Sequence, residues 1–302
     1  MLDLSADVGG LKLRLPLMPA SGILGGSPDA LEAVAKKAKV GALVTKTLTL
    51  EPRKGNDPPI VVSTPCGLVN AVGLANPGVK VAKELVEVGR KYNLPVVVSI
   101  AGKDEREFAE AAWASVDAGA SALELNLSCP HAKGLGLELG MDINAVRKVV
   151  EAVATTVNVP VFAKLGLVDK LVDTASAALD AGASGLVLIN TIRAMVIDID
   201  VMEPVLTNKV GGLSGRAIHP IAVRAVYEVY KELKAPIVGV GGVYEWRDAV
   251  ELVLAGASAV QIGSAVADKG LGVFSEVLAG LAWWLHSKGF RSLREAVGAA
   301  VR

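Results

Sequence analysis

The chain has 302 residues, of which 52% are hydrophobic and 21% charged, so it can bury a large core. Lys and Arg together number 31 and so do Asp and Glu, and this net charge of zero argues against nucleic acid or an anionic membrane as partner. No apolar run approaches the roughly 18 residues of a membrane span, and the first residues lack a signal-peptide pattern. The two cysteines have neither the spacing of a metal site nor that of a disulfide framework. We therefore expect a cytoplasmic protein.

One unit recurs along the chain. In each copy a proline opens an apolar strand, a helix follows, and a turn of small residues starts a second strand; the copies begin at Pro95, Pro160 and Pro236, with a degenerate copy from Pro16. The four units predict eight strands, at 15–21, 42–47, 96–101, 123–128, 161–165, 185–190, 237–241 and 259–263.

These strands are nearly continuous in Val, Ile, Leu and Ala and alternate with helices, which is typical of a parallel sheet covered on its outside. Eight of them close most naturally into a (β/α)8 TIM barrel, and we expect a single domain over residues 1–302. An open doubly wound sheet is the alternative, but no GxGxxG follows the first strand.

The stretch LELNLSCP, at 123–130, ends the fourth predicted strand. Leu123, Leu125 and Leu127 alternate with polar residues, a period that predicts a half-buried strand. Cys129 follows where the strand turns into a loop, before Pro130 stops further pairing. Its thiol could be a general base, a nucleophile or a small core side chain.

Two connections, 48–80 and 191–216, are longer than the repeating unit needs. Both follow a strand and precede a helix, so both lie on the face where barrel enzymes keep their active sites. Long ordered insertions on that face usually bind something, which makes these segments candidate parts of a site.

Polar residues gather at the ends of the predicted strands, and in a barrel these ends converge on one cavity. They are Ser21, Lys46, Ser99, Asn126, Cys129, Lys164, Asn190 and Thr191. A lysine inside an apolar strand, such as Lys164, is costly unless its ammonium meets an anion or an open site. The group therefore indicates a catalytic or binding site.

Glycines end the last two strands, as Gly241-Gly242 and Gly263-Ser264. Loops at these places in barrels commonly bind a phosphate through bare backbone N–H groups, and the glycine-rich segment 211–215 could supply more. A phosphate held there would put a ring system within reach of the lysines. This arrangement suits FMN, whose N1 and O2 region gains negative charge on reduction and is stabilised by a lysine.

The chain resembles the class 1 dihydroorotate dehydrogenases over nearly its whole length. The matching motifs are MPASG (18–22), TKT around Lys46, EPRKGN (51–56), NAVGLANPG (70–78), ELNLSCP (124–130), AKL around Lys164, INT (189–191), GGLSG (211–215), GVGG (239–242) and IGSA (262–265). The segment from MVIDI to TNKVGGLSG is most similar to the B-type branch, whose barrel subunit pairs with an iron–sulfur FAD subunit that passes electrons to NAD.

The resemblance implies conversion of dihydroorotate to orotate in pyrimidine biosynthesis, with Cys129 as the base for the C5 proton and hydride transfer from C6 to flavin N5. The implied substrate-binding residues are Lys46, Asn70, Ala71, Val72, Gly73, Leu74, Asn126, Asn190 and Thr191. The implied FMN-binding residues are Ser21, Lys46, Thr47, Ser99, Asn126, Lys164, Ile189, Gly215, Gly241, Gly242, Gly263 and Ser264. Relatives of this class also imply a homodimer or a heterotetramer.

Two positions depart from the family pattern. Ser99 stands where the family often has asparagine, which leaves its contact with the flavin open. His131 follows Cys129-Pro130 where bacterial members mostly have asparagine, and CPH also occurs in the related barrel of dihydropyrimidine dehydrogenase. A reductase of uracil or thymine is therefore one alternative. A tRNA-dihydrouridine synthase and a non-catalytic barrel are weaker ones, since the chain has no basic surface and keeps its lysines, asparagines and cysteine together.

Overall fold

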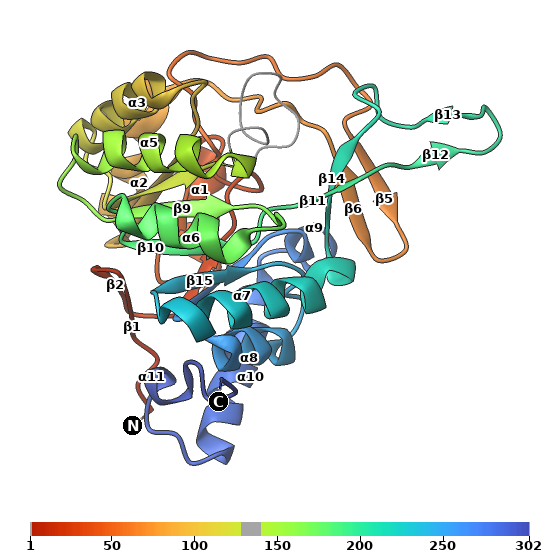
Figure 1. Ribbon diagram of the computed structural model, residues 1–302. Helices are drawn as coiled ribbons and strands as arrows, with labels where there is room; N and C mark the ends of the chain where they lie inside the picture. The colour runs from red at the N-terminus through yellow and green to blue at the C-terminus, as the bar shows by residue number, and fades with distance from the viewer. Residues whose placement is uncertain (1, 128–139, 302) are drawn as a thin grey trace.

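The computed structural model describes residues 2–127 and 140–301, and eight parallel strands form its centre (Figure 1). They are β3 (Leu17–Pro19), β4 (Leu43–Val44), β7 (Val96–Ile100), β8 (Ala122–Asn126), β9 (Val161–Leu165), β10 (Gly185–Leu188), β15 (Ile237–Val240) and β16 (Ala259–Ile262). Their order is β3-β16-β15-β10-β9-β8-β7-β4, and at the seam between β4 and β3 the Gly41 N–H donates to the Leu17 carbonyl at 2.8 Å. The predicted TIM barrel is confirmed, and each strand falls within or overlaps its predicted segment.

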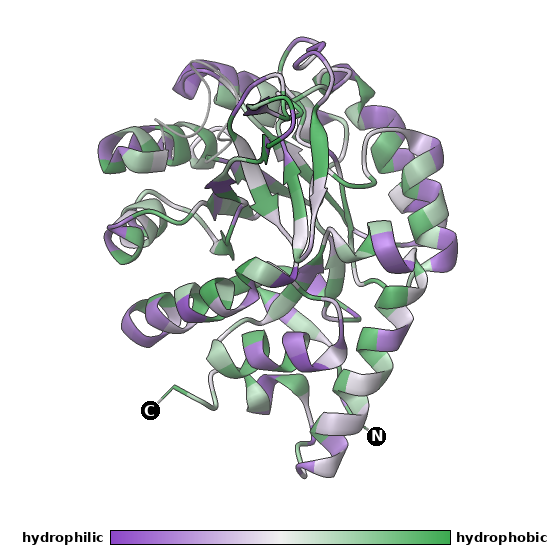
Figure 2. Cartoon of the chain, turned by 90° about the vertical axis from the view of Figure 1, so that its right-hand side faces the viewer, coloured by the Kyte–Doolittle hydropathy of each residue, from purple (hydrophilic) through white to green (hydrophobic). Residues whose placement is uncertain are grey.

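Helices cover the outside of this sheet. They are α1 (Pro28–Lys37), α2 (Ala82–Tyr92), α3 (Glu105–Asp117), α5 (Ile143–Ala154), α6 (Leu171–Asp180), α7 (His219–Leu233), α8 (Trp246–Ala255), α9 (Ala265–Lys269), α10 (Gly272–Ser287) and α11 (Leu293–Ala296), with short 3-10 turns η1 (Val79–Val81) and η2 (Arg216–Ile218). In α5, Val146, Val149, Val150 and Val153 form one buried stripe at helical spacing. Figure 2 shows the polar faces of the helices turned away from the strands. No helix within the described residues is long and apolar enough to cross a membrane.

The lower part of the barrel interior is apolar. Alternate residues of the strands, among them Val97, Phe162 and Val238, form a cluster separate from the core between strands and helices. The amino-terminal hairpin of β1 (Ala6–Val8) and β2 (Leu11–Leu13) adds Val8, Leu11 and Leu13 to the cluster. This hairpin lies against the amino ends of β9 and β10, since a Cβ on Gly9 would come within 1.9 Å of the Ser184 carbonyl.

The upper part of the interior is polar, and here one prediction was wrong. All five residues of β8 are buried, so the strand is not half-buried. Its leucines pack outward against the helices, while Glu124 and Asn126 lie on the inward face, beyond Ala122 of the apolar cluster. The polar residues of the strand face the inside of the barrel and the apolar residues face the helices. Neither face of the strand is exposed to solvent.

The two long connections come together above the barrel. Residues 48–80 contain β5 (Val61–Thr64) and β6 (Gly67–Asn70), and residues 191–216 contain β11 (Ile192–Ala194), β12 (Ile197–Asp198), β13 (Glu203–Pro204) and β14 (Gly211–Ser214). β14 pairs with β6, which gives an antiparallel sheet in the order β11-β14-β6-β5, while β12 and β13 extend outward as a hairpin (Figure 1). The glycine pattern had suggested that residues 211–214 form a loop with free backbone amides. They form a paired strand instead.

We expect Phe162→Ala to lower the free energy of unfolding by about 3–5 kcal/mol, because it leaves a cavity in the closed interior of the barrel. Phe162 is 2% exposed and belongs to the interior cluster. Chemical denaturation of the purified protein measures the change. Trp113→Ala on the outside of α3, where the side chain is 60% exposed, is the control and should cost far less. Equal effects would contradict a packed interior.

Candidate functional site

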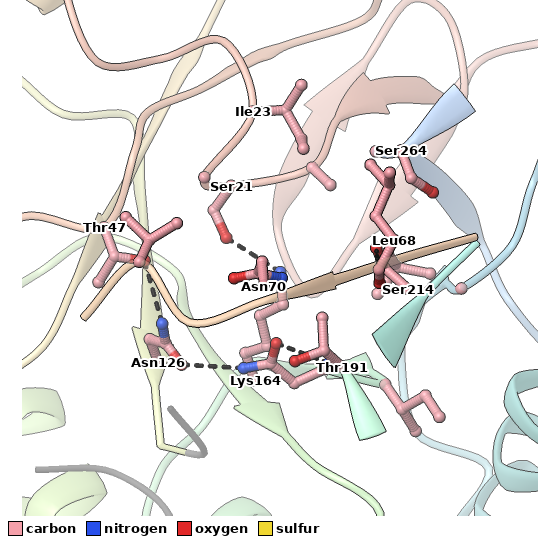
Figure 3. A pocket seen from close by; sticks show the side chains of 18 of the residues that line it. Ser21, Ile23, Thr47, Leu68, Asn70, Asn126, Lys164, Thr191, Ser214 and Ser264 are labelled. Atoms are coloured by element: carbon pink, nitrogen blue, oxygen red, sulfur yellow. Dashed lines mark hydrogen bonds between the residues drawn. The ribbon is translucent and has the colours of Figure 1, made fainter. Parts of the chain in front are cut away.

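A pocket of about 280 Å³ lies at the carboxyl ends of the barrel strands, below the four-stranded sheet. Most of the predicted site residues line it: Ser21, Lys46, Thr47, Asn70, Val72, Gly73, Leu74, Asn126, Lys164, Ile189, Asn190, Thr191, Gly215, Gly241, Gly242, Gly263 and Ser264. Figure 3 shows several of their side chains directed at one space, from the barrel strands on one side and from the inserted sheet on the other. The structure thus brings together residues that are up to 243 positions apart in the sequence.

Two predicted residues in the described part of the chain do not line the pocket. Ala71 is buried beside β6. Ser99 is fully buried behind Thr47, and the distance from Thr47 Oγ1 to Ser99 Oγ is 3.0 Å. Cys129 and the neighbouring His131 lie outside the described residues.

Apart from Val72, Leu74 and Ile189, the apolar lining of the pocket was not predicted. Its side chains include Ile23, Val61, Leu68, Ile218 and Val240. Val61 and Leu68 reach the pocket only because β5 and β6 pair with β14, so no local signal in the sequence marks them. Apolar walls with a few polar groups suit a planar organic ring.

A buried ion pair forms the base of the pocket. Lys164 Nζ on β9 donates to Glu124 Oε1 on β8 at 3.3 Å, to Ser21 Oγ at 3.0 Å and to Gln261 Oε1 at 3.4 Å. Gln261 Nε2 donates in turn to Glu124 Oε2 at 2.8 Å. Glu124 is therefore the anion that the sequence required for Lys164, and its signal was a carboxylate in the middle of a predicted barrel strand.

Glu124 remains ionised despite its burial. Loss of solvent alone would raise the pKa of Glu124, but the Lys164 ammonium and hydrogen bonds from Gln261 and Ser21 outweigh this and hold the pKa below its ordinary value. The ammonium and carboxylate therefore face each other as charges in the interior of the barrel.

Lys46 is a second cation at the pocket and has a different environment. Its Nζ has no hydrogen-bond or ion-pair partner within residues 2–127 and 140–301, and desolvation lowers its pKa. A partly desolvated ammonium without a partner is costly to the folded chain. It is suited to bind the carboxylate of a ligand, which would supply the missing counter-charge.

Two amide side chains, from β8 and from the end of β10, also line the pocket. Asn126 Nδ2 donates to Thr47 Oγ1 at 3.1 Å, and Asn190 Nδ2 donates to Asn126 Oδ1 at 3.1 Å. The Thr191 N–H donates to Asn190 Oδ1 at 2.8 Å. This side of the pocket presents paired hydrogen-bonding groups, which a ring carrying C=O and N–H groups can match.

The loop that covers this side is held in a tight shape. Gly73 and Leu74 both have positive φ, 73° and 57°, and Leu74 is a residue type that rarely adopts such a conformation. Asn56, from the EPRKGN motif, fixes the loop by donating from Nδ2 to the Ala71 carbonyl at 2.8 Å. Strained backbone of this kind is often kept where a ligand binds.

The opposite side of the pocket carries open backbone donors. The N–H groups of Gly242, Gly263 and Ser264 have no hydrogen-bond acceptor among the described residues. Gly242 has φ of 66°, and a Cβ there would come within 2.7 Å of the Gly215 carbonyl oxygen and of His219 Cβ. Several unpaired N–H groups on bare backbone form a site for a phosphate. Ser214 and Ser264 lie on this side, across the pocket from Thr47 and Asn126 (Figure 3).

Comparison with known proteins gives a consistent result. The family described as dihydroorotate dehydrogenase matches residues 3–285. A putative dihydroorotate dehydrogenase A (fumarate) of Aeropyrum pernix is 52% identical over 301 residues, 99% of this chain and 98% of the relative. The catalytic subunit of dihydroorotate dehydrogenase B (NAD(+)) is 46% identical in Pyrococcus furiosus, covering 99% of both chains, and 43% identical in Thermoplasma acidophilum, covering 100% of both.

We expect Lys46→Met to make the substrate-free protein more stable at neutral pH, by on the order of 1 kcal/mol, because it removes a desolvated charge. Between the lowered pKa of Lys46 and the ordinary 10.5, the unfolded chain holds a proton that the folded chain lacks, so this part of the stability rises with pH. The advantage of the variant should therefore shrink as the pH rises through that window.

Urea denaturation at several pH values measures both effects. Lys83→Met on the exposed face of α2 is the matched control and should change little. A variant of Lys46 that is less stable than the wild type would show that the ammonium has a structural partner.

Proposed function

The chain belongs to the dihydroorotate dehydrogenase family, and from this premise we propose how its pocket serves the oxidation of dihydroorotate to orotate in pyrimidine biosynthesis. The observation that carries the proposal is the division of the pocket. Lysines and amides form one side, and unpaired glycine N–H groups form the other. Such a site can hold a small planar anion next to a larger phosphate-bearing ring.

We propose FMN as the cofactor. The N–H groups of the glycine side and the apolar side chains that line the same pocket fit a phosphate joined to a ring system. The proposed contacts are Ser21, Lys46, Thr47, Asn126, Lys164, Ile189, Gly215, Gly241, Gly242, Gly263 and Ser264. Bound there, FMN would supply the hydride acceptor for carbon 6 of dihydroorotate. Ser99 does not line the pocket, so we do not include it among the direct contacts.

The substrate would lie against the lysine and amide side. Lys46 has no counter-charge among the described residues, so we propose that it binds the substrate carboxylate. Asn70, Asn126, Asn190 and Thr191 would then pair with the ring C=O and N–H groups, below the loop at 70–74. Ala71 would take part only through the backbone of that loop.

Cys129 is the proposed base for the C5 proton. The proposal rests on the ELNLSCP motif, since Cys129 lies outside the described residues; Leu127, the last described residue before it, follows Asn126 directly. A thiolate can remove the proton, and the lost proton and hydride together account for the new C5–C6 double bond.

The two alternative enzyme activities are not favoured. Relatives that match the whole chain are named dihydroorotate dehydrogenases, and none of those reported above is named as a reductase of uracil or as a tRNA-modifying enzyme. A non-catalytic barrel would have no use for a desolvated lysine that has no partner among residues 2–127 and 140–301. The effect of His131 on substrate choice stays a question for experiment.

We expect the oxidised flavoprotein to lose its flavin colour when dihydroorotate is added without oxygen, and not when dihydrouracil or dihydrothymine is added. In Cys129→Ser this reduction should slow by about 10²-fold or more at neutral pH and recover partly as the pH rises, because a hydroxyl is a much poorer base than a thiol. Stopped-flow absorbance measures the rate.

Cys66→Ser is the matched control, since Cys66 is exposed at the turn between β5 and β6. It should be reduced at the wild-type rate. If Cys129→Ser is also reduced at that rate, Cys129 is not the base; if the wild type keeps its colour, dihydroorotate is not the substrate.

We further propose that the chain works as one FMN-binding barrel domain in the cytoplasm and passes its electrons to a partner subunit. Several relatives are named as the catalytic subunit of dihydroorotate dehydrogenase B (NAD(+)), which supports a separate electron-transfer subunit. The proposed partner carries FAD and an iron–sulfur cluster, in a heterotetramer; a homodimer is the alternative assembly. The relative named as a fumarate-dependent enzyme supports a second route, in which the electrons pass directly to fumarate.

These routes differ in the isolated chain. Under the partner proposal, dihydroorotate should reduce an artificial dye through the purified chain, at a rate at least ten times that with NAD+ or fumarate. Addition of the electron-transfer subunit should then allow NAD+ reduction, followed at the absorbance of NADH. Rapid orotate formation with fumarate alone would overturn the partner proposal and favour the A-type route.

A further inference from the structure

A continuous chain of buried side chains connects the ion pair to the amides of the pocket. We propose that Glu124 and Ser99 are positioning residues, which fix the direction of this hydrogen-bond chain and thereby decide where Asn126 and Asn190 offer a donor or an acceptor to the substrate. The inference rests on the proposed function, because it concerns the same substrate pocket. Neither Glu124 nor Ser99 lines that pocket, and both are 0% exposed.

The chain has four links. Ser99 Oγ lies 3.2 Å from Glu124 Oε1, and Thr47 Oγ1 lies 3.0 Å from Ser99 Oγ. Asn126 Nδ2 lies 3.1 Å from Thr47 Oγ1, and Asn190 Nδ2 lies 3.1 Å from Asn126 Oδ1. These residues come from β7, β8 and the ends of β4 and β10, so the chain crosses the barrel interior just below the pocket.

The chemistry of the first residue sets the direction of the others. An ionised carboxylate can only accept hydrogen bonds, so the single hydroxyl proton of Ser99 is donated to Glu124. Ser99 can then only accept from Thr47, which uses the single proton of Thr47. The Thr47 oxygen is left as an acceptor, and it must be met by the nitrogen of Asn126 and not by its oxygen.

The amide of Asn126 is therefore held with its nitrogen toward Thr47 and its oxygen toward Asn190. A flipped amide would place two donors together at Asn190 and two acceptors together at Thr47, and a buried unmatched polar group costs about 1–3 kcal/mol. The ionisation of Glu124 supports the scheme: Lys164, Gln261 and Ser99 all donate to its oxygens.

The fixed orientation of the Asn126 amide affects which ligands the pocket binds. Orotate offers C=O and N–H groups at fixed places on its ring, and a reversed amide would exchange the donor and acceptor that it meets. A pocket with one enforced direction rejects an analogue with the reversed pattern, because a buried polar group is then left unmatched. A pocket whose amides can turn would lose that rejection while keeping its shape.

Ser99→Ala tests the proposal with a small change. The variant removes the hydroxyl but leaves the bond from the Ser99 N–H to Thr45 Oγ1, at 3.0 Å, so the strand keeps its pairing. Thr47 is then free to donate to either partner, and both directions of the Asn126 amide become possible. Ser115→Ala is the matched control, because Ser115 is also fully buried but donates to the Ala111 carbonyl within α3.

The measurement is calorimetric binding to the oxidised flavoprotein of orotate and of its 2-amino and 4-amino analogues, in each of which one ring C=O is replaced by C–NH₂. We expect Ser99→Ala to bind orotate roughly tenfold more weakly and to lose roughly tenfold of its preference for orotate over at least one analogue. Flavin content should stay at the wild-type level, and Ser115→Ala should match the wild type throughout.

Glu124→Gln is the second variant, since a neutral amide of the same shape can donate as well as accept. If Glu124→Gln folds, it should lose the same preference for orotate over the analogue. If it does not fold, Ser99→Ala alone tests the proposal. An unchanged preference in Ser99→Ala, or an equal loss of affinity for orotate and both analogues, would overturn the inference. A wild type that binds no orotate and is not reduced by dihydroorotate would instead overturn the proposed function and the inference with it.

Discussion

The ion pair between Glu124 and Lys164 is the interaction on which the site depends. It lies inside a barrel whose lower interior is filled by apolar side chains, and it begins the polar layer two residues further along the strands. Such a pair adds little net stability, because desolvation of both charges offsets most of their attraction, whereas removal of one partner alone typically costs about 3–5 kcal/mol. Its value is therefore positional. It holds an ammonium at the base of the pocket and an acceptor-only group next to Ser99.

The pocket also depends on the sheet formed by the two insertions. Barrel strands alone would leave their carboxyl ends open to solvent, and the pairing of β14 with β6 brings Leu68, Asn70 and Gly215 over them. The junction requires close approach of bare backbone: Gly215 has φ of 111°, and a Cβ there would come within 2.5 Å of Gly67 Cα. Desolvation beneath this cover lowers the pKa of Lys46 and strengthens any ion pair that a ligand makes with it.

The two lysines thus have separate electrostatic tasks. Lys164 has its counter-ion, Glu124, built into the barrel at 3.3 Å. Lys46 has no partner among the described residues, and a ligand carboxylate could supply its counter-ion. A site that carries one satisfied and one unsatisfied cation can hold a permanent cofactor and still select for a substrate with a carboxylate.

The sequence alone determined the barrel, its eight strands and the polar and glycine residues at the strand ends, because strand period, repeated units and strand-end residues are local signals. The loop at 70–74 was implied only by the resemblance to a known family. The sequence also marked Lys164 as a side chain in need of an anion. The tertiary structure decided which groups meet: Glu124 with Gln261, 137 residues away, and Asn70 with the Gly212 carbonyl, 142 residues away. It also placed Ser99 behind Thr47 and not against the pocket. These contacts depend on how the barrel closes and how the insertions pair, and no periodicity within one segment records that geometry.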